Sequence, residues 1–600
     1  MATAISFCKD TIHIAQLLRK PTNSVANFGR FVRGTGQSPS AMHGMTLVQR
    51  HAELIYAEAS LLKAVMGILY SGDFFGFVAE ALNMRNAYGI YRSLSKYVEW
   101  ADEQAAKKHG KGAIDESIDE DFRSGVYLGS GLISMILGLL PGKVLKIMEV
   151  FGYGGDCVEG LKILCKSGEW SPNPKHLKPG MPMEEEGVRR QICDMAILLY
   201  HLVISTFMPV NGVNIPMADK ILHYNLERYP EGIFFLYFSG RLYSSQSLAE
   251  KAITQFMKAR DVQREYVQLQ HICYWDMTLC HMSLGQWKEA HDCFDVLLND
   301  SNWSKAVYNY GKAANLYQSG GDNPSKEAGK LIIKTPSLMQ RIAGKSIPLE
   351  KFVARKAGKF REQGRLLLPA LEFSYFFHCV STAPRYILAD EHLVAVSTEL
   401  KEIQDHESDP SSYHSGEDEF WDDFCLAHFL RAVTLKYIAH PESHAKARPK
   451  ESPIPANEAE DQAEMSLKTV IENREKITGD HYLIYFAHYE LGRLYAAMGR
   501  KDEAREEFKL VLSGKNMGDK GRKGKYSMQV STDPLSVVPL LSNANLFSPT
   551  EHVPAPLQRC SRWPVLGLGQ TLYGSPGPSP LPAIHFPVVH LLLARLDTSS

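Results

Sequence analysis

The stretch 485–511, YFAHYELGRLYAAMGRKDEAREEFKLV, constrains the fold of this chain most tightly. Gly492 and Tyr495 stand at the spacing L-G-x-x-Y, and Ala504 and Phe508 follow at the spacing A-x-x-x-F. This pattern is typical of two antiparallel helices that form one unit of about 34 residues. Small residues at Gly492 and Ala504 let the two helices cross closely, while the rings of Tyr495 and Phe508 fill the space beside the crossing.

Such a unit is the tetratricopeptide repeat, and a single copy cannot bury its own apolar face. It therefore predicts neighbouring helical hairpins. Two further units align with the pattern, at 233–266 and at 271–304, although the second is degenerate at the Gly and Tyr positions. We predict an all-α fold, a tetratricopeptide-like helical repeat or α-solenoid, with long atypical helical hairpins in the N-terminal half.

A chain of 600 residues is too long for one compact core, so it is expected to contain several parts. Apolar periodicity marks the helical parts, and charged or Gly/Pro-rich runs mark the connections between them. The expected parts are a partial N-terminal helix and flexible linker at 1–44, atypical long helical hairpins at 45–170, a helical array at 187–404, an acidic loop at 405–419, C-terminal repeats at 420–518 (a split unit at 420–475 with an inserted loop at 441–462, and a repeat at 485–518), and a basic, then Pro/Ser-rich disordered tail at 519–600.

The end of the chain differs in character from the rest. Beyond Met528 it has few charges, many Pro and Ser residues and no apolar periodicity, so we expect 528–600 to be disordered. The abrupt change leads to the hypothesis that this tail comes from a mispredicted exon or from read-through.

Charge and cysteine usage exclude some classes of function. The net charge is −1, which provides no field for binding nucleic acid, and the basic run 515–525 has no interleaved aromatic residues. The ten cysteines show no CxxC pair and no framework spacing, so reduced thiols in the cytoplasm or nucleus are expected. Lys9 and Asp10 interrupt the N-terminus where a signal peptide would be apolar.

One stretch needs a choice between a core helix and a membrane segment. Val126 to Leu140 is apolar over about 15 residues, whereas a membrane span needs about 20. We therefore favour a buried helix, and membrane contact, if any, is expected to be peripheral. A membrane adaptor anchored by 125–150 is kept as the alternative.

Motifs that would carry chemistry are incomplete. Gly344-Lys345-Ser346 ends like a phosphate-binding loop, but Met339 occupies the position of the first required glycine. His440 and His444 are four residues apart, as are the two histidines of the metalloprotease motif H-E-x-x-H. That motif requires a helix, which the proline-rich polar sequence around these histidines does not favour. The sequence thus predicts no catalytic residue, no cofactor and no metal ligand, and the chain is not expected to be an enzyme.

The first helix of each repeat is expected to line a surface that binds protein partners. Aromatic and arginine side chains at its outward positions resemble an interface in composition. The alternative is that neighbouring helices cover these side chains. The predicted partner surface comprises Phe234, Tyr237, Arg241, Trp275, Tyr489 and Arg493.

The segments between the repeats carry a more specific resemblance. RHAELIYAEASLLKAV (50–65), FGYGGDCVEGLKIL (151–164) and NGVNIPMADKILHYNLERYPEGIFFLYFSGRL (211–242) resemble the fungal inclusion body clearance protein family, whose animal counterparts are called tetratricopeptide repeat protein 39. The chain is expected to be a fungal-type member, and the resemblance covers roughly 45–527.

This resemblance implies a non-enzymatic scaffold of the cytoplasm and nucleus that binds other proteins. It implies a role in inclusion body clearance after protein-folding stress, in connection with lipid droplets, so that aggregated or lipid-droplet-associated proteins are the expected partners. The second function that it implies is a peripheral adaptor at the mitochondrial outer membrane or at lipid droplets that takes part in lipid handling.

Overall fold

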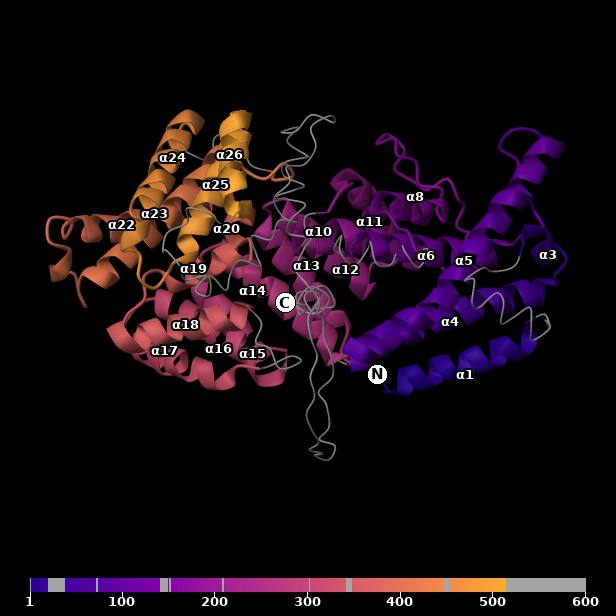
Figure 1. Ribbon diagram of the computed structural model, residues 1–600, viewed down its shortest axis with the longest axis horizontal. Helices are drawn as coiled ribbons and strands as arrows, with labels where there is room; N and C mark the ends of the chain where they lie inside the picture. The colour runs from indigo at the N-terminus through magenta and orange to yellow at the C-terminus, as the bar shows by residue number, and fades with distance from the viewer. Residues whose placement is uncertain are drawn as a thin grey trace. The chain divides into compact units, whose positions relative to one another are not determined.

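The computed structural model describes residues 2–19, 38–71, 74–140, 149, 153–207, 210–301, 303–340, 348–446 and 454–513. All regular structure in these residues is helical, without a strand (Figure 1). The predicted all-α fold of tetratricopeptide-like helical repeats is thereby confirmed. Residues 20–37 of the predicted linker, the sequence Gly344-Lys345-Ser346 and the tail predicted at 519–600 lie outside the described residues.

The chain divides into two compact units, with the boundary between Pro230 and Glu231. Unit 1 is the N-terminal one. Its described helices are α1 (Ala2–Leu18), α3 (Pro39–His43), α4 (Leu47–Ser71), α5 (Phe74–His109), α6 (Glu120–Gly138), α8 (Cys157–Lys166), α9 (Arg190–Leu199), which continues through the π-helical turn η1 (Tyr200–Ile204) into α10 (Ser205–Phe207), and α11 (Ile215–Arg228).

The long hairpin of unit 1 consists of α4, with 25 residues, and α5, with 36 residues. Helix α1 lies along α4, as Figure 1 shows. Cys8 and Ala15 are buried on one side of α1, and the Arg19 guanidinium contacts the carboxylate of Glu53 at 2.7 Å. Cys8, Ala15 and Arg19 are separated by seven and four positions, which places them on one face of a helix.

Glycines let α6 and α8 pack with their backbones in contact. A Cβ atom on Gly160 of α8 would lie 2.7 Å from the carbonyl oxygen of Gly131 on α6, closer than atoms of this kind approach. Both helices begin at an aspartate cap, because Asp119 accepts a hydrogen bond from the Phe122 N–H and Asp156 accepts one from the Glu159 N–H. The glycine-rich sequence of this region therefore serves close helix packing.

Helix α6 contains most of the apolar stretch for which a membrane anchor was the alternative. It runs from Glu120 to Gly138 and buries Phe122, Val126 and Ile133 within unit 1. Among the residues that the structure describes, no helix is both long enough and apolar enough to cross a membrane.

Unit 2 begins at Glu231, and its successive helices pack against one another along the chain. Its described helices are α12 (Ile233–Ser245), α13 (Ala249–Val262), α14 (Val267–Ser283), α15 (Trp287–Asp300), α16 (Lys305–Gln318), α17 (Asp322–Lys334), η2 (Thr335–Leu338), α18 (Pro348–Gln363), α19 (Pro369–Phe376), α20 (Cys379–Thr382), α21 (Arg385–Ile387), the π-helical η3 (Leu388–His392), α22 (Leu393–Gln404), η4 (Pro410–Ser412), α23 (Glu417–Ala439), α24 (Ala456–Glu472), η6 (Arg474–Lys476), α25 (Tyr482–Ala497) and α26 (Lys501–Ser513).

A contact between a glycine and a phenylalanine ring recurs in these hairpins. The Phe256 ring of α13 lies against Gly240 of α12, and the Phe508 ring of α26 lies against Gly492 of α25. Both pairs are formed by the two helices of one predicted repeat. A side chain on either glycine would meet the ring, so the sequence pattern L-G-x-x-Y…A-x-x-x-F is explained by the distance between the two helices.

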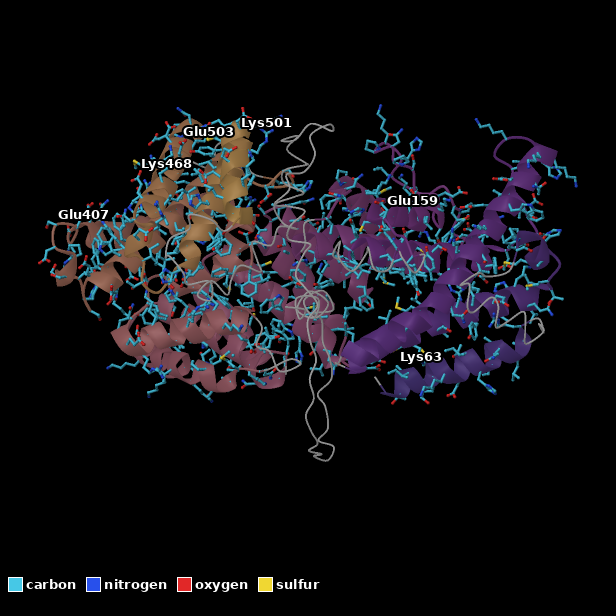
Figure 2. The ribbon with its side chains drawn as sticks, viewed as in Figure 1. Lys63, Glu159, Glu407, Lys468, Lys501 and Glu503 are labelled. Atoms are coloured by element: carbon cyan, nitrogen blue, oxygen red, sulfur yellow. The ribbon has the colours of Figure 1, made fainter. Side chains whose placement is uncertain are left out.

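The last three helices share a surface of paired charges. Glu464 of α24 contacts Lys468 at 2.6 Å and accepts a hydrogen bond from the Tyr495 hydroxyl at 3.0 Å. Arg500, just before α26, contacts Glu464 at 2.5 Å. Figure 2 shows the labelled Lys468, Lys501 and Glu503 on the upper part of this helical group.

Candidate functional site

Unit 1 contains a groove of about 690 Å³ between α5, α6 and the segment that precedes α8. Its volume lies in the range of sites that bind small ligands or peptide segments. The groove, called the α5–α6 groove below, is lined by Tyr88, Tyr91, Arg92, Ser95, Lys96, Glu99, Ser130, Ile133, Ser134, Glu149, Tyr153 and Gly154.

One row of side chains on α5 forms a wall of the groove. Tyr88, Arg92, Lys96 and Glu99 follow one another at intervals of three or four residues, which places them on one helical face. Arg92, Lys96 and Glu99 are exposed. Neither Arg92 nor Lys96 forms a hydrogen bond or an ion pair with any residue that the structure describes. The groove therefore presents two cationic groups one helical turn apart.

The serine hydroxyls of the groove and the hydroxyl of Tyr88 are already engaged with protein atoms. The hydroxyls of Ser95 and Ser130 are hydrogen-bonded to each other at 2.7 Å, which joins α5 to α6. The Tyr88 hydroxyl donates to the carbonyl oxygen of Gly154 at 3.4 Å and accepts the Gly154 N–H at 3.3 Å. These bonds fix the walls before any ligand binds.

A glycine makes room for Tyr91, one of the tyrosines that line the groove. The Tyr91 ring lies so close to Gly129 of α6 that a Cβ atom at Gly129 would overlap it. Burial raises the pKa of the Tyr91 hydroxyl, so this group stays protonated near neutral pH. Tyr91 therefore contributes a fixed, uncharged surface.

The predicted partner surface lies in unit 2, and part of it is engaged inside that unit. The Tyr237 hydroxyl donates to one carboxylate oxygen of Asp276 at 2.6 Å, and Arg241 donates to the other at 2.5 Å. All three side chains are buried. Phe234, one turn before Tyr237, is 43% exposed and remains available to a partner.

The remaining residues of the predicted partner surface are half-buried in unit 2. Trp275 packs edge-on against Phe377, with ring centroids 5.1 Å apart. The Arg493 guanidinium donates to the Tyr437 hydroxyl at 2.8 Å, and it stacks over the Tyr489 ring. The structure does not bring the six predicted residues into one groove, and their role toward partners stays a prediction.

A buried cluster of charges joins distant parts of unit 2. Lys356 of α18 is 2% exposed and contacts Glu372 at 2.8 Å and Asp480 at 3.1 Å. Lys359 contacts Asp480 at 2.9 Å and Asp423 at 3.3 Å. Burial alone would lower the pKa of Lys359, but the neighbouring carboxylates raise it well above its ordinary value. The cluster is structural, because its charges are paired with one another inside the fold.

Sequence reasoning did not single out the α5–α6 groove. The signal was present in YGIYRSLSK (88–96), where tyrosines and cations alternate at helical spacing. This spacing defines a helical face, but it does not identify the helix opposite. Ser130 lies 35 residues along the chain from its hydrogen-bond partner Ser95, so that the groove depends on tertiary packing.

Comparisons with known proteins give two matches. The family model described as Iml2/Tetratricopeptide repeat protein 39 matches residues 1–438. Tetratricopeptide repeat protein ttc-39B of Caenorhabditis elegans is 28% identical over 455 residues, which cover 75% of this chain and 70% of the relative. The family match starts at residue 1, so it includes 1–44, a part that the sequence resemblance had left out.

Proposed function

The chain belongs to the Iml2/tetratricopeptide repeat protein 39 family, and from this premise we propose that it is a non-enzymatic scaffold that binds other proteins in inclusion body clearance. In this role it acts in the cytoplasm and nucleus after protein-folding stress, in connection with lipid droplets. Its partners are aggregated or lipid-droplet-associated proteins. The coarser part of this statement, a scaffold of tetratricopeptide type for protein interactions, follows from the family and the fold.

The observation that carries the proposal is the recurrence of close-packed helical hairpins. The contacts of Gly240 with Phe256 and of Gly492 with Phe508 show that the first and the last hairpin of unit 2 pack by the same rule. Repeats of this kind present extended surfaces made of helical side chains, and such surfaces bind proteins. The α5–α6 groove supplies a concave surface lined by tyrosine, arginine and lysine side chains. Tyrosine and arginine are enriched at protein–protein interfaces.

The state of the cysteine thiols supports a non-enzymatic role. A nucleophilic cysteine needs a lowered pKa, since the thiolate is the reactive form. Burial instead raises the pKa of Cys165, Cys193 and Cys273 to about 12. Within the described ranges, no group of three or more His, Cys, Asp or Glu side chains is placed to hold a metal ion.

The experiment that tests the proposal combines partner mapping with a clearance assay. The full chain, fused to a promiscuous biotin ligase, is expressed in cells that carry an aggregation-prone reporter. We expect labelling of the reporter and of lipid-droplet proteins, and we expect slower loss of reporter inclusions when the gene is deleted. Unchanged clearance together with no labelling of either class contradicts the proposal.

A peripheral adaptor at lipid droplets or the mitochondrial outer membrane, acting in lipid handling, is the second candidate function. One observation favours it. Helix α1 leaves Phe7, Ile14, Leu17 and Leu18 exposed, whereas Cys8 and Ala15 of the same helix are buried. An exposed apolar row on a helix is the kind of surface that lies in a membrane interface.

Flotation of the purified chain with phospholipid-coated triolein droplets tests this second function. The replacement of Phe7 and Leu18 by serine should abolish flotation if α1 is the contact. If the unmodified chain does not float with the droplets, or if the variant floats equally well, α1 does not form a peripheral contact.

A further inference from the structure

We infer that the α5–α6 groove binds short acidic peptide segments, with Arg92 and Lys96 holding two of their carboxylates. The inference rests on the proposed protein-binding function, for which it names one site and the chemistry of its ligand. It concerns residues of unit 1 alone.

The first argument is the arrangement of the cations. Arg92 and Lys96 are four residues apart on α5, so their Cβ atoms lie about 5–6 Å from each other on the same face. Both are exposed on the wall of the groove and have no ionic partner among the described residues. A planar guanidinium beside an ammonium group matches the carboxylates of two acidic side chains that are close in sequence.

The second argument is that the three serine hydroxyls of the wall are already hydrogen-bonded to protein atoms. The Ser95 and Ser130 hydroxyls bind each other, and the Ser134 hydroxyl donates to the Asp156 carbonyl at 3.0 Å. These serine hydroxyls therefore need no partner from a ligand, and the two cationic side chains provide the polar recognition. A wall that is rigid before binding lowers the cost of ordering upon association.

The third argument is the aromatic part of the groove. Tyr88 and Tyr153 pack with ring centroids 4.9 Å apart, and Tyr153 is anchored beside the Gly154 backbone that Tyr88 binds. Tyr91 lies on Gly129 and stays neutral. These rings offer apolar surface for an aromatic or aliphatic side chain that stands between the acidic residues of a peptide.

The acidic residues of the groove define the kind of anion that fits. Glu99 follows Lys96 by three positions on α5, and Glu149 lines another part of the groove. A nucleic-acid backbone, with a charge at every phosphate, would place charges against these carboxylates. A peptide with a few spaced acidic groups avoids this repulsion, which favours a peptide ligand over a polyanion.

The test is fluorescence anisotropy of the full chain with a short fluorescein-labelled peptide in which glutamate alternates with phenylalanine and leucine. The comparison peptide carries glutamine in place of every glutamate. Inorganic phosphate, added as a competitor, reports whether the site recognises any anion. We expect saturable binding of the glutamate peptide, at least tenfold weaker binding of the glutamine peptide, and no competition by millimolar phosphate.

Two variants locate the site. The double variant Arg92→Glu/Lys96→Glu should weaken binding at least tenfold. The matched control Lys107→Glu/Lys108→Glu reverses the same number of charges on α5 at exposed positions outside the groove, and it should change affinity less than twofold. A third variant, Ser130→Tyr, fills the groove without a change in charge and should also weaken binding, and circular dichroism checks that each variant keeps its helicity.

Equal effects of the two charge reversals would overturn the inference, because they would show a diffuse electrostatic attraction. Competition by phosphate at the same level as by unlabelled peptide would also overturn it, since the groove would then hold simple anions. Partner labelling in cells separates these failures from a failure of the proposed function. If the groove variant keeps the full set of labelled partners, the scaffold function stands and only the inferred peptide site is wrong.

Discussion

The Phe508 ring lies against the backbone of Gly492, so close that a Cβ atom on Gly492 would stand 2.7 Å from Cε1 of Phe508. Gly492 belongs to α25 and Phe508 to α26, sixteen positions later. Phe256 has the same relationship to Gly240, also sixteen positions apart. The glycine in each pair fixes the separation of two helices, because any larger residue would push the ring away.

We predict that Gly492→Ala destabilises unit 2 although alanine is the better helix former. The added methyl group overpacks the crossing, which typically costs about 1–3 kcal/mol. Urea unfolding monitored by circular dichroism measures this loss. The matched control is Gly358→Ala in α18, where an added Cβ atom meets nothing within 4 Å, and there we expect a gain of about 0.5–1 kcal/mol. Equal midpoints for the two variants would show that Gly492 is not a packing constraint.

The repeat crossings could be predicted from the sequence because they are local. Gly492 and Phe508 lie within one motif, and the motif's spacing already contains the geometry of their contact. The family resemblance of 50–65, 151–164 and 211–242 is likewise confirmed by the match over residues 1–438. The local spacing of the repeat and these three segments were thus sufficient to predict the fold class and the family.

The groove and the buried charges could not be predicted in this way. Lys356 and Lys359 appear in the sequence as part of a basic helix, which normally implies a solvated face. Their partner Asp480 lies 124 residues beyond Lys356. Tyr237 and Arg241 have the residue types of a partner surface, yet the carboxylate that they bind is Asp276, on the next hairpin. Side-chain chemistry alone does not tell an internal partner from an external one.

The buried cluster predicts a large effect for a single charge removal. Lys359→Met would leave Asp480, Asp423 and Asp422 without the ammonium group that lies 2.9–3.4 Å from them. Removal of one partner from a buried ionic cluster costs about 3–5 kcal/mol. The exposed Lys351→Met on the same helix is the control, and we expect a change within about 0.5 kcal/mol there. Thermal unfolding gives the melting temperatures of the two variants. Similar melting temperatures would contradict the structural role of Lys359.

Substitutions at Phe234 and Tyr237 should affect two different properties, the binding of partners and the free energy of unfolding. Tyr237→Phe removes a buried hydrogen bond to Asp276, so we expect a loss of about 1–3 kcal/mol in the free energy of unfolding. Phe234→Ser changes an exposed side chain and should leave that free energy within about 0.5 kcal/mol. If Phe234 contacts partners, the serine variant should lose part of the set labelled in cells. An unchanged set removes Phe234 from the predicted partner surface.

Two buried histidines predict a loss of stability in acid. Burial lowers the pKa of His201 and of His392 from 6.5 to about 4. The His201 Nδ1 atom accepts the N–H of Asn214 at 3.3 Å, which requires a ring without a proton at that atom. His392 stacks on Trp287, with ring centroids 6.1 Å apart. Both rings are therefore neutral in the folded chain at neutral pH.

The sign of the effect follows from the proton count. Between pH 6.5 and pH 4 the unfolded chain binds a proton at each histidine, whereas the folded chain does not. The stability that a neutral histidine contributes is thus fully present above pH 6.5, and it is lost as the pH falls toward 4. A shift of this size corresponds to about 3 kcal/mol for each residue.

The substitution His392→Phe isolates this contribution from the carboxylates that titrate in the same range. Phenylalanine preserves the stacking on Trp287 but takes up no proton, so its unfolding free energy should fall less steeply between pH 6.5 and pH 4 than that of the unmodified chain. The exposed His109→Gln on α5 is the control, and its pH profile should run parallel to that of the unmodified chain. Urea unfolding at a series of pH values gives the three profiles. A His392→Phe profile that is parallel to the other two would show that the ring of His392 is protonated in the folded chain as readily as in the unfolded one.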